Sequence, residues 1–177
     1  QGWWRNKSIQ NSWLRTDSYD ERQFGGTSTI VTNDLTTYIT EKGADERDLG
    51  RWSWYTLSDP GSIINTTIIT MYYPQNSQGA GSVNGQQLKK IREDHPLLTE
   101  TALVLFRRDL HKFIQTKQRK QHQIVVMGDM NQDIQSSKSP LVKMFRSLGL
   151  SEAVTTKYGG VAPATWAYGT KPIDGIF

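Results

Sequence analysis

Short segments rich in β-branched and aromatic residues, separated by turn residues, fill the chain from residue 27 to residue 73. Four of them predict strands: 27–32, 36–40, 51–58 and 63–73. In the third, Trp52, Trp54 and Thr56 alternate with Ser53 and Tyr55, which predicts a pleated strand with one buried face. No helix or strand is predicted for the polar stretch 1–23, which precedes these strands. After them, residues 75–87 are rich in Gly, Ser, Asn and Gln and predict a loop.

The second half of the chain carries helical periodicity. One face of a first helix is formed by Leu98, Ala102, Leu105, Phe106, Leu110 and Phe113, and a Lys/Arg-rich run follows to Lys120. A second helix has Ser139 at its N-cap, Pro140 at its first position and Gly149 at its end. Its apolar stripe is Leu141, Met144, Phe145 and Leu148.

Between the two helices, residues 124–127 form a continuous apolar run, which predicts a strand covered on both faces. This order of strands and helices predicts an α/β chain with mixed sheets. Neither an internal repeat nor a linker is visible, so we expect one domain over residues 1–177.

Composition narrows the classes of function. The chain has 177 residues, 36% of them hydrophobic, which suffices for a buried core. It has no cysteine, which excludes disulfides, zinc–thiolate centres and thiol nucleophiles, and none of its three histidines has metal-ligand spacing. No apolar stretch is long enough to span a membrane. A net charge of +4 and a pI near 9.3 are compatible with a polyanionic partner.

The candidate chemistry starts with Gly128, Asp129 and Asn131, directly after the predicted buried strand. Polar groups at the end of such a strand face the crevice in which α/β folds bind ligands. The alternative is an Asx turn that leaves the strand, because Asp and Asn side chains cap turns. A calcium loop is excluded, since its sixth and twelfth positions are here Ile134 and Pro140.

Two further candidates lie at strand ends. Tyr72 closes the strand 63–73 and could reach a phosphate oxygen, or it could be a core tyrosine before the turn at Pro74. Asp174, within 172–177, either faces inward with a partner or points outward from an alternating strand. Gly25–Thr27 lacks the Gly-Lys-Ser/Thr ending of a nucleotide-binding loop and predicts a tight turn.

The order of these features resembles the endonuclease/exonuclease/phosphatase superfamily. Its members include deoxyribonuclease I, abasic-site endonucleases and the endonucleases of retrotransposons. The resemblance runs from about Gln23 to Phe177. It is carried by the Gly-Gly-Thr before a strand, Tyr72-Tyr73-Pro74, the Gly-Asp-x-Asn step at 128–131, Thr165, and Ile-Asp-x-Ile-Phe at 173–177. It implies a four-layer α/β sandwich with two facing mixed β-sheets and outer helices, incomplete at both termini.

Specific roles are implied by the same resemblance. Asp129 would orient or deprotonate the attacking water, and Asn131 would hydrogen-bond that water or the phosphoryl oxygens. Tyr72 would hold the scissile phosphate, and Asp174 would orient a histidine that contacts it. The amide that commonly follows Tyr-x-Pro is Gln75 here, a third candidate for phosphate binding. The implied cofactor is Mg²⁺ or Mn²⁺.

Two groups that the resemblance calls for are expected outside this chain. The metal-binding glutamate, in a Gln-Glu step, would precede Gln1, and a Ser-Asp-His would follow Phe177. The chain opens without methionine and stops within a predicted strand, so both ends are interpreted as truncations. Residues 1–177 alone are therefore expected to be close to inactive even if folded.

Three functions compete on this evidence. The first is a magnesium-dependent DNA endonuclease. The basic clusters 89–90, 107–108 and 117–120 favour this function. The second is a phosphatase acting on inositol- or lipid-type phosphoesters. The third is a non-catalytic module, either a decayed relic of a mobile element or a nucleic-acid-binding platform. The first implies a soluble, intracellular monomer, with the nucleus as a candidate compartment and a reverse transcriptase as a candidate fusion or partner.

Overall fold

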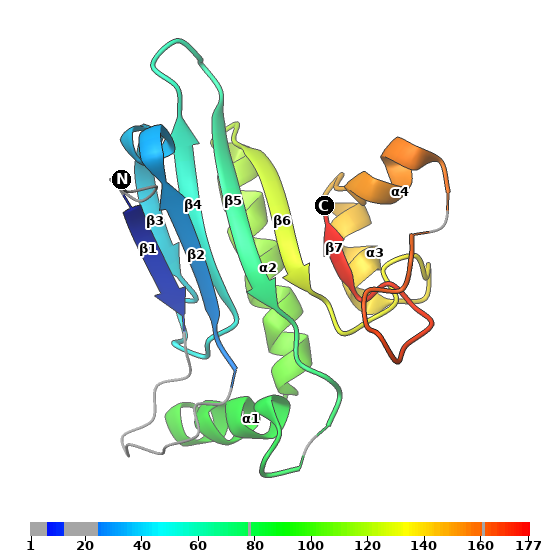
Figure 1. The fold of residues 1–177 in the computed structure, drawn as a ribbon. Helices are drawn as coiled ribbons and strands as arrows, with labels where there is room; N and C mark the ends of the chain where they lie inside the picture. Colours follow the sequence, from blue (N-terminus) through cyan, green and yellow to red (C-terminus); the bar gives the residue numbers. More distant parts are fainter. Residues whose placement is uncertain (1–6, 13–24, 78, 161) are drawn as a thin grey trace, which may run out of the picture.

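The computed structural model describes residues 7–12, 25–77, 79–160 and 162–177, drawn in Figure 1. In chain order the elements are β1 (Lys7–Ser12), β2 (Thr27–Thr32), a 3-10 helix η1 (Asn33–Tyr38), β3 (Ile39–Ala44), β4 (Trp52–Ser58), β5 (Asn65–Tyr72), α1 (Val83–Asp94), α2 (Ala102–Arg119), β6 (Gln123–Asp129), α3 (Pro140–Ser147), α4 (Ala153–Tyr158) and β7 (Asp174–Ile176). Among these residues no helix has both the length and the apolar character needed to cross a bilayer.

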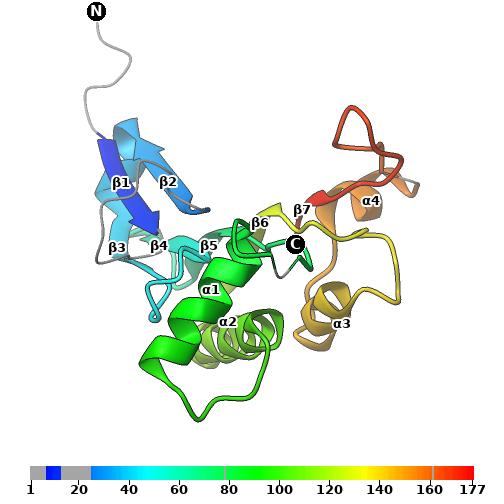
Figure 2. The ribbon, with the colours of Figure 1, turned by 90° about the horizontal axis from the view of Figure 1, so that it is seen from below.

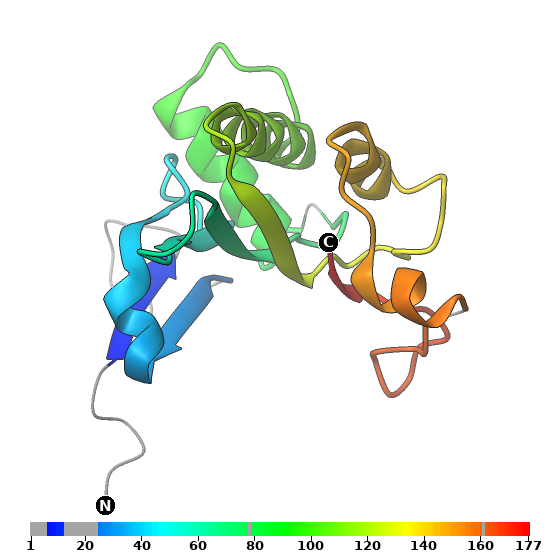
Figure 3. The same cartoon turned by 90° about the horizontal axis from the view of Figure 1, so that it is seen from above.

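The strands form two sheets that face each other. β1 and β2 make a two-stranded antiparallel sheet, and the second sheet has the order β3-β4-β5-β6-β7. In the larger sheet only β5 and β6 pair in parallel, so α1 and α2 form the crossover between them. The predicted α/β fold with two facing sheets and outer helices is confirmed. Figures 2 and 3 show α1, α2 and α3 on one side of the larger sheet, with β1 and β2 on the other.

The main core lies between the five-stranded sheet and helices α2 and α3. Trp52 on β4, Ile69 on β5 and Val126 on β6 are buried there against Phe106 of α2 and Phe145 of α3. The Trp52 and Phe106 rings meet edge to face with centroids 5.5 Å apart. Such pairs contribute about 0.5–1.5 kcal/mol beyond the area they bury. This core fixes which face of β5 and β6 points away from the helices.

The start of α3 follows its predicted signals, whereas α2 begins at Ala102, so Leu98 of the predicted apolar face lies before the helix. Thr101 caps α2 by accepting a hydrogen bond from the Val104 N–H, and the Ser139 hydroxyl accepts one from Val142 N–H at 3.3 Å. Pro140 is the first residue of α3, and Gly149 beyond its end has φ +74°. The prediction for the start of α3 is therefore confirmed.

Several predicted elements differ in the structure. Residues 36–40 were predicted as a strand, but residues 33–38 form η1 and β3 starts only at Ile39. Strand β4 is buried on both faces, not one, because β1 and β2 cover Ser53 and Tyr55. Strand β6 is the reverse case: Val126 is fully buried, whereas Val125 and Met127 on the other face are only half-buried. The predicted loop 75–87 ends at Ser82, where α1 begins.

A close approach between β5 and β6 makes Gly128 indispensable to the fold. Gly128 has φ +140°, and a Cβ added there would lie 1.9 Å from the Met71 carbonyl oxygen. Gly128→Ala is expected to lower the free energy of unfolding by about 2–4 kcal/mol, since it adds both overlap and backbone strain. Urea denaturation measures the loss. Gly149→Ala is the matched control: its φ is also positive but open space surrounds it, so about 1–2 kcal/mol is expected. Equal losses in the two variants would contradict the close approach.

Candidate functional site

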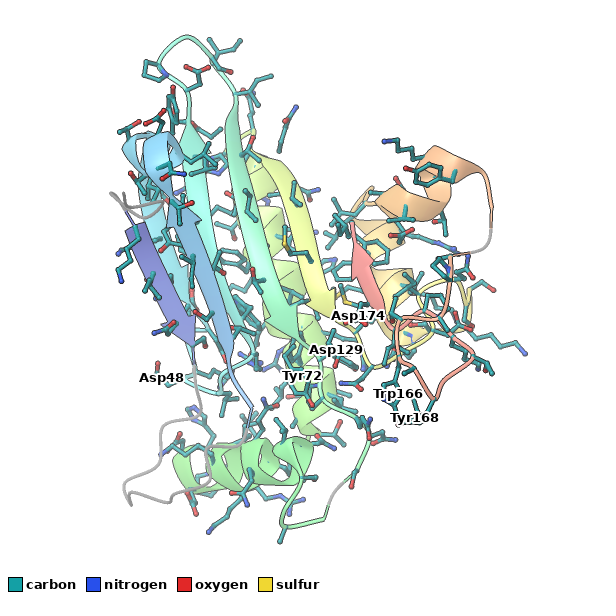
Figure 4. The ribbon with its side chains drawn as sticks, in the orientation of Figure 1. Asp48, Tyr72, Asp129, Trp166, Tyr168 and Asp174 are labelled. Carbon is teal, nitrogen blue, oxygen red and sulfur yellow. The ribbon has the colours of Figure 1, made fainter. Side chains whose placement is uncertain are left out.

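Three of the predicted site residues lie in one cross-strand row. Tyr72 is the last residue of β5 and pairs with Asp129, the last residue of β6, and Asp129 pairs in turn with Asp174 at the start of β7. Met71 is buried against the helices, so the side chain of Tyr72 points to the opposite face of the sheet. Figure 4 shows Tyr72, Asp129 and Asp174 gathered at this end of the sheet. The structure thus brings together residues 57 and 45 positions apart in the sequence.

The residues of this row are not equally exposed to solvent. Tyr72 and Asp129 are half-buried, whereas Asp174 is exposed. Of the two alternatives for Asp174, the structure shows the solvent-exposed one, with the carboxylate next to Asp129. The backbone under the row is held firmly, because Tyr73 N–H donates to the Asp129 carbonyl at 2.8 Å and Met130 N–H to the Ile173 carbonyl at 2.7 Å.

Asn131 is hydrogen-bonded to Asp129. It adopts φ +46°, a left-handed conformation that Asn tolerates better than most residues. Its backbone N–H donates to Asp129 Oδ1 at 2.8 Å. Its Nδ2 donates to Asp129 Oδ2 at 3.2 Å and to the Tyr73 carbonyl at 2.8 Å. Since an amide nitrogen has two hydrogens, both donors of Asn131 are used, and its action here is to orient Asp129.

Gln75 completes a chain of polar groups that ends at Asp129. Its Nε2 donates to Asn131 Oδ1 at 3.2 Å, and its side chain is exposed. One amide hydrogen of Gln75 is used in this bond, which leaves the second for another acceptor. The predicted grouping of Gln75 with Asn131 is therefore present, but Gln75 is the amide at the surface and Asn131 the one beneath it.

The environment of Asp129 favours its protonated form. Burial raises the pKa of this carboxyl first of all, and the neighbouring Asp174 charge raises it further, while the Asn131 hydrogen bonds oppose both effects. A carboxyl whose pKa is higher in the folded than in the unfolded chain stabilises the fold only below its unfolded pKa. That contribution disappears as the pH rises through the folded pKa. A carboxyl pKa raised by burial and by a neighbouring carboxylate is a common property of functional carboxylates.

Asp174→Asn is expected to lower the pKa of Asp129, because it removes a negative charge while keeping the shape of the side chain. A ¹³C NMR titration of the Asp129 carboxyl carbon measures the change. Asp133→Asn is the control, since Asp133 is not among the groups that shift the pKa of Asp129. An unchanged Asp129 titration in Asp174→Asn would show that the two carboxylates do not interact.

A metal ion needs more ligands than this row supplies. Among residues 7–12, 25–77, 79–160 and 162–177, no group of three His, Cys, Asp or Glu side chains is placed to hold one. Mg²⁺ in proteins is often bound by one or two carboxylates together with waters and substrate phosphates. Asp129 and Asp174 could serve as such a pair, but the described residues make no complete metal site.

Comparison with known proteins was made on sequence and on structure. No family model and no curated protein matches the sequence. Similar solved structures include beta toxin from Staphylococcus aureus (TM-score 0.45, 16% identity, 95% of this chain and 62% of that chain). Sphingomyelinase C from Streptomyces griseocarneus is another (TM-score 0.45, 12% identity, 94% and 61%). A Staphylococcus aureus beta toxin variant with bound magnesium ions also matches (TM-score 0.43, 17% identity, 90% and 55%).

This chain spans less than two thirds of the length of each of these structures. A likeness at this level concerns the course of the backbone.

The basic clusters singled out in the sequence do not border the row as free charges. Arg108 pairs with Glu100, Lys89 with Glu93, and Lys90 with Asp94, all on the helical layer. Arg107 donates to the Tyr73 hydroxyl, and Lys117 is buried against Glu41 at 2.5 Å. The positions of these basic residues therefore give no support to a nucleic-acid partner.

Two aromatic residues near the row were missed in the sequence. Trp166 and Tyr168 lie in the segment between α4 and β7 and are exposed by 56% and 87%. Figure 4 shows both beside the end of the sheet that carries Asp129 and Asp174. The available signal was their position just before the Ile-Asp-x-Ile-Phe segment, in a stretch with no aliphatic residue larger than alanine other than prolines.

Proposed function

We propose that this chain carries the hydrolytic residues of a metal-dependent phosphodiesterase, and that the phosphodiester is in DNA. The observation that carries the proposal is the row of Tyr72, Asp129 and Asp174, with Asn131 fixing the orientation of Asp129. A half-buried carboxylate with a raised pKa, held by two hydrogen bonds beside a phenol, fits a general base next to a phosphate.

In the proposed reaction Asp129 accepts a proton from the attacking water. Its two oxygens each receive one hydrogen bond from Asn131, so lone pairs remain for the water. The water oxygen forms a bond to phosphorus while the ester P–O bond breaks, and the leaving oxygen takes a proton from solvent. Negative charge builds on the phosphoryl oxygens during this step, where hydrogen-bond donors are most valuable. Tyr72 supplies a hydroxyl, and Gln75 supplies the amide hydrogen that its bond to Asn131 leaves over. Asp174 keeps the pKa of Asp129 raised and thereby strengthens it as a base.

Mg²⁺ or Mn²⁺ dependence is part of the proposal. Phosphodiester hydrolysis gains from a divalent cation that neutralises charge on the phosphate. The described residues do not make a complete site for this ion, so at least one principal ligand is expected outside these residues. Removal of divalent cations with EDTA is expected to stop hydrolysis, and Mg²⁺ should restore it.

The test is a panel of substrates offered to the protein in its natural full length. Supercoiled plasmid, inositol phosphates and sphingomyelin vesicles are incubated with Mg²⁺ or with EDTA, and the products are measured over time. We expect cleavage of plasmid DNA only, with DNA binding that weakens steeply as salt rises, because phosphate contacts release counterions.

The other outcomes separate the alternatives. Cleavage of an inositol phosphate or of sphingomyelin, without any cleavage of DNA, would replace the proposed substrate by a small or lipid phosphoester. DNA binding without cleavage of any substrate would favour the third hypothesis, a non-catalytic module.

A further inference from the structure

The segment between α4 and β7 presents two aromatic rings next to the row. Trp166 and Tyr168 are exposed by 56% and 87%, and their rings meet edge to face with centroids 5.7 Å apart. Large exposed rings are expensive to leave in water, and a contiguous pair marks a contact surface more often than a single ring does. We call Trp166 and Tyr168 the aromatic pair.

The backbone ties the aromatic pair to the row. The Thr165 hydroxyl accepts hydrogen bonds from the N–H groups of Ile173 and Asp174, at 3.0 and 3.1 Å. Trp166 follows Thr165 directly, so its position is linked to that of Asp174. A turn closes between Gly169 N–H and the Trp166 carbonyl at 3.0 Å, and a Cβ on Gly169 would lie only 3.0 Å from the indole. These contacts fix the backbone on both sides of Trp166.

The aromatic pair stands on the same side of the larger sheet as the row. Figures 2 and 3 both show the segment before β7 on the side that carries β1 and β2, away from α1 and α2. Tyr72 points to that side as well, because Met71 occupies the helical side. The aromatic pair and the row are therefore open to the same substrate on this side of the sheet.

The chemistry of this segment fits a nucleobase better than a lipid surface. Residues 162–172 contain Trp166, Tyr168 and Lys171 but no Leu, Ile, Val, Met or Phe to enter an acyl layer. The side chain of Lys171 is 66% exposed and lies 3.9 Å from Asp133, so it can turn to a phosphate. Aromatic rings beside a cation are the combination that binds single-stranded nucleic acids.

We propose that the aromatic pair receives an unpaired base next to the phosphodiester that is cleaved, with the base stacked on the face of one ring and against the edge of the other, which makes single-stranded nucleic acid the preferred partner of this site. The inference rests on the proposed function for its orientation relative to the row. Stacking needs a free base face, which duplex DNA does not offer within its length. Cleavage should therefore concentrate at single-stranded, frayed or distorted positions.

Binding tests the proposal without relying on catalysis. Full-length protein carrying Asp129→Asn is titrated with a labelled oligonucleotide of about eight thymidines, and fluorescence anisotropy gives Kd. Adding Trp166→Ala or Tyr168→Ala should weaken binding about 5- to 150-fold, the range for loss of one base–aromatic stack. Trp166→Phe keeps a ring and should stay within about threefold. Tyr158→Ala removes another exposed aromatic, on α4, and should leave Kd unchanged.

Two further ligands decide what the rings recognise. An oligonucleotide of equal length without bases should bind weakly, and equally so with or without Trp166→Ala. Phosphatidylcholine–sphingomyelin vesicles should not bind through the aromatic pair. The proposal is overturned if Trp166→Ala leaves oligonucleotide binding intact, if the loss is as large without bases, or if only vesicle binding depends on the rings.

The outcomes for the two proposals can be told apart. Base-dependent binding through Trp166 by a protein that cleaves no phosphodiester would overturn the proposed function alone. Cleavage of DNA at equal rates by the wild type and by Trp166→Ala, on both single and double strands, would overturn the stacking inference alone.

Discussion

Asp129→Asn is expected to lower kcat/KM for phosphodiester hydrolysis by about 10³- to 10⁴-fold. Asparagine keeps the size of the side chain and one oxygen to accept the Asn131 N–H, but it cannot take a proton from water. The loss should appear in kcat, since the substituted group acts on the transition state. Initial rates on DNA with Mg²⁺, at saturating and limiting substrate, measure both constants for the full-length protein.

The matched control for this variant is Asp59→Asn. Asp59 is an exposed aspartate in the turn between β4 and β5, where it caps the Gly61 N–H, a bond that asparagine also makes. Its activity should remain within about twofold of the wild type, because surface changes away from special features have small effects. An Asp129→Asn enzyme with activity near that of Asp59→Asn would remove Asp129 from the reaction.

The second large effect concerns the ion pair under the row. Arg51 donates to Asp45 from Nε at 2.6 Å and from Nη2 at 2.5 Å, and both side chains are almost fully buried. Asp45 also accepts the Leu49 N–H. Asp45→Ala is expected to lower the free energy of unfolding by about 3–5 kcal/mol, because it leaves a buried guanidinium with Asp109 as its remaining acidic partner. Urea denaturation at neutral pH measures the loss.

This ion pair also matters to the site. The Arg51 carbonyl accepts the Tyr72 N–H at 3.0 Å, so loosening of Arg51 should displace the strand end that carries Tyr72. Lys89→Ala is the control: its pair with Glu93 is exposed and 3.9 Å long, and its loss should change stability by less than about 0.5 kcal/mol. A similarly small loss in Asp45→Ala would mean that the buried pair is not important to the fold.

The sequence predicted those parts of the fold whose signals are local. Ser139 and Pro140 set the start of α3 by hydrogen bonding and by a fixed φ, which need no distant contact. Residues 33–38 misled the prediction because Thr-rich segments favour strands. There Asn33 adopts φ 57°, and the Thr36 and Thr37 hydroxyls bond back to the carbonyls of residues 33 and 34, which bends the chain into η1.

Other elements depend on tertiary packing. Helix α1 was missed because part of its buried face is polar: Asn84 and Gln87 are covered along with Leu88 and Ile91, so the apolar stripe is weak. The two-sided burial of β4 arises from contact with β1, where the Tyr55 hydroxyl donates to Ser8 Oγ at 3.0 Å. No periodicity within β4 itself could reveal that contact.

The candidate site, too, was predictable from the sequence only in part. Its members were found from their order at strand ends, and their register was left to the fold. Asn131 bonds to Tyr73 and Gln75, which lie 58 and 56 positions away in the sequence, so these contacts could not be read from the local motif. Trp166 and Tyr168 were not predicted as site residues, because only the structure shows that they lie near Asp174.

The central claim is that Tyr72, Asp129 and Asp174 act as one hydrolytic unit on a DNA phosphodiester. The most direct test is the rate at which full-length protein nicks supercoiled plasmid in Mg²⁺, compared between Asp129→Asn and a combined variant that adds Tyr72→Phe and Asp174→Asn. Groups that act as a unit have strongly non-additive effects, so the combined variant should be about as slow as Asp129→Asn alone. Losses that multiply from one substitution to the next, or wild-type nicking by Asp129→Asn, would contradict the account.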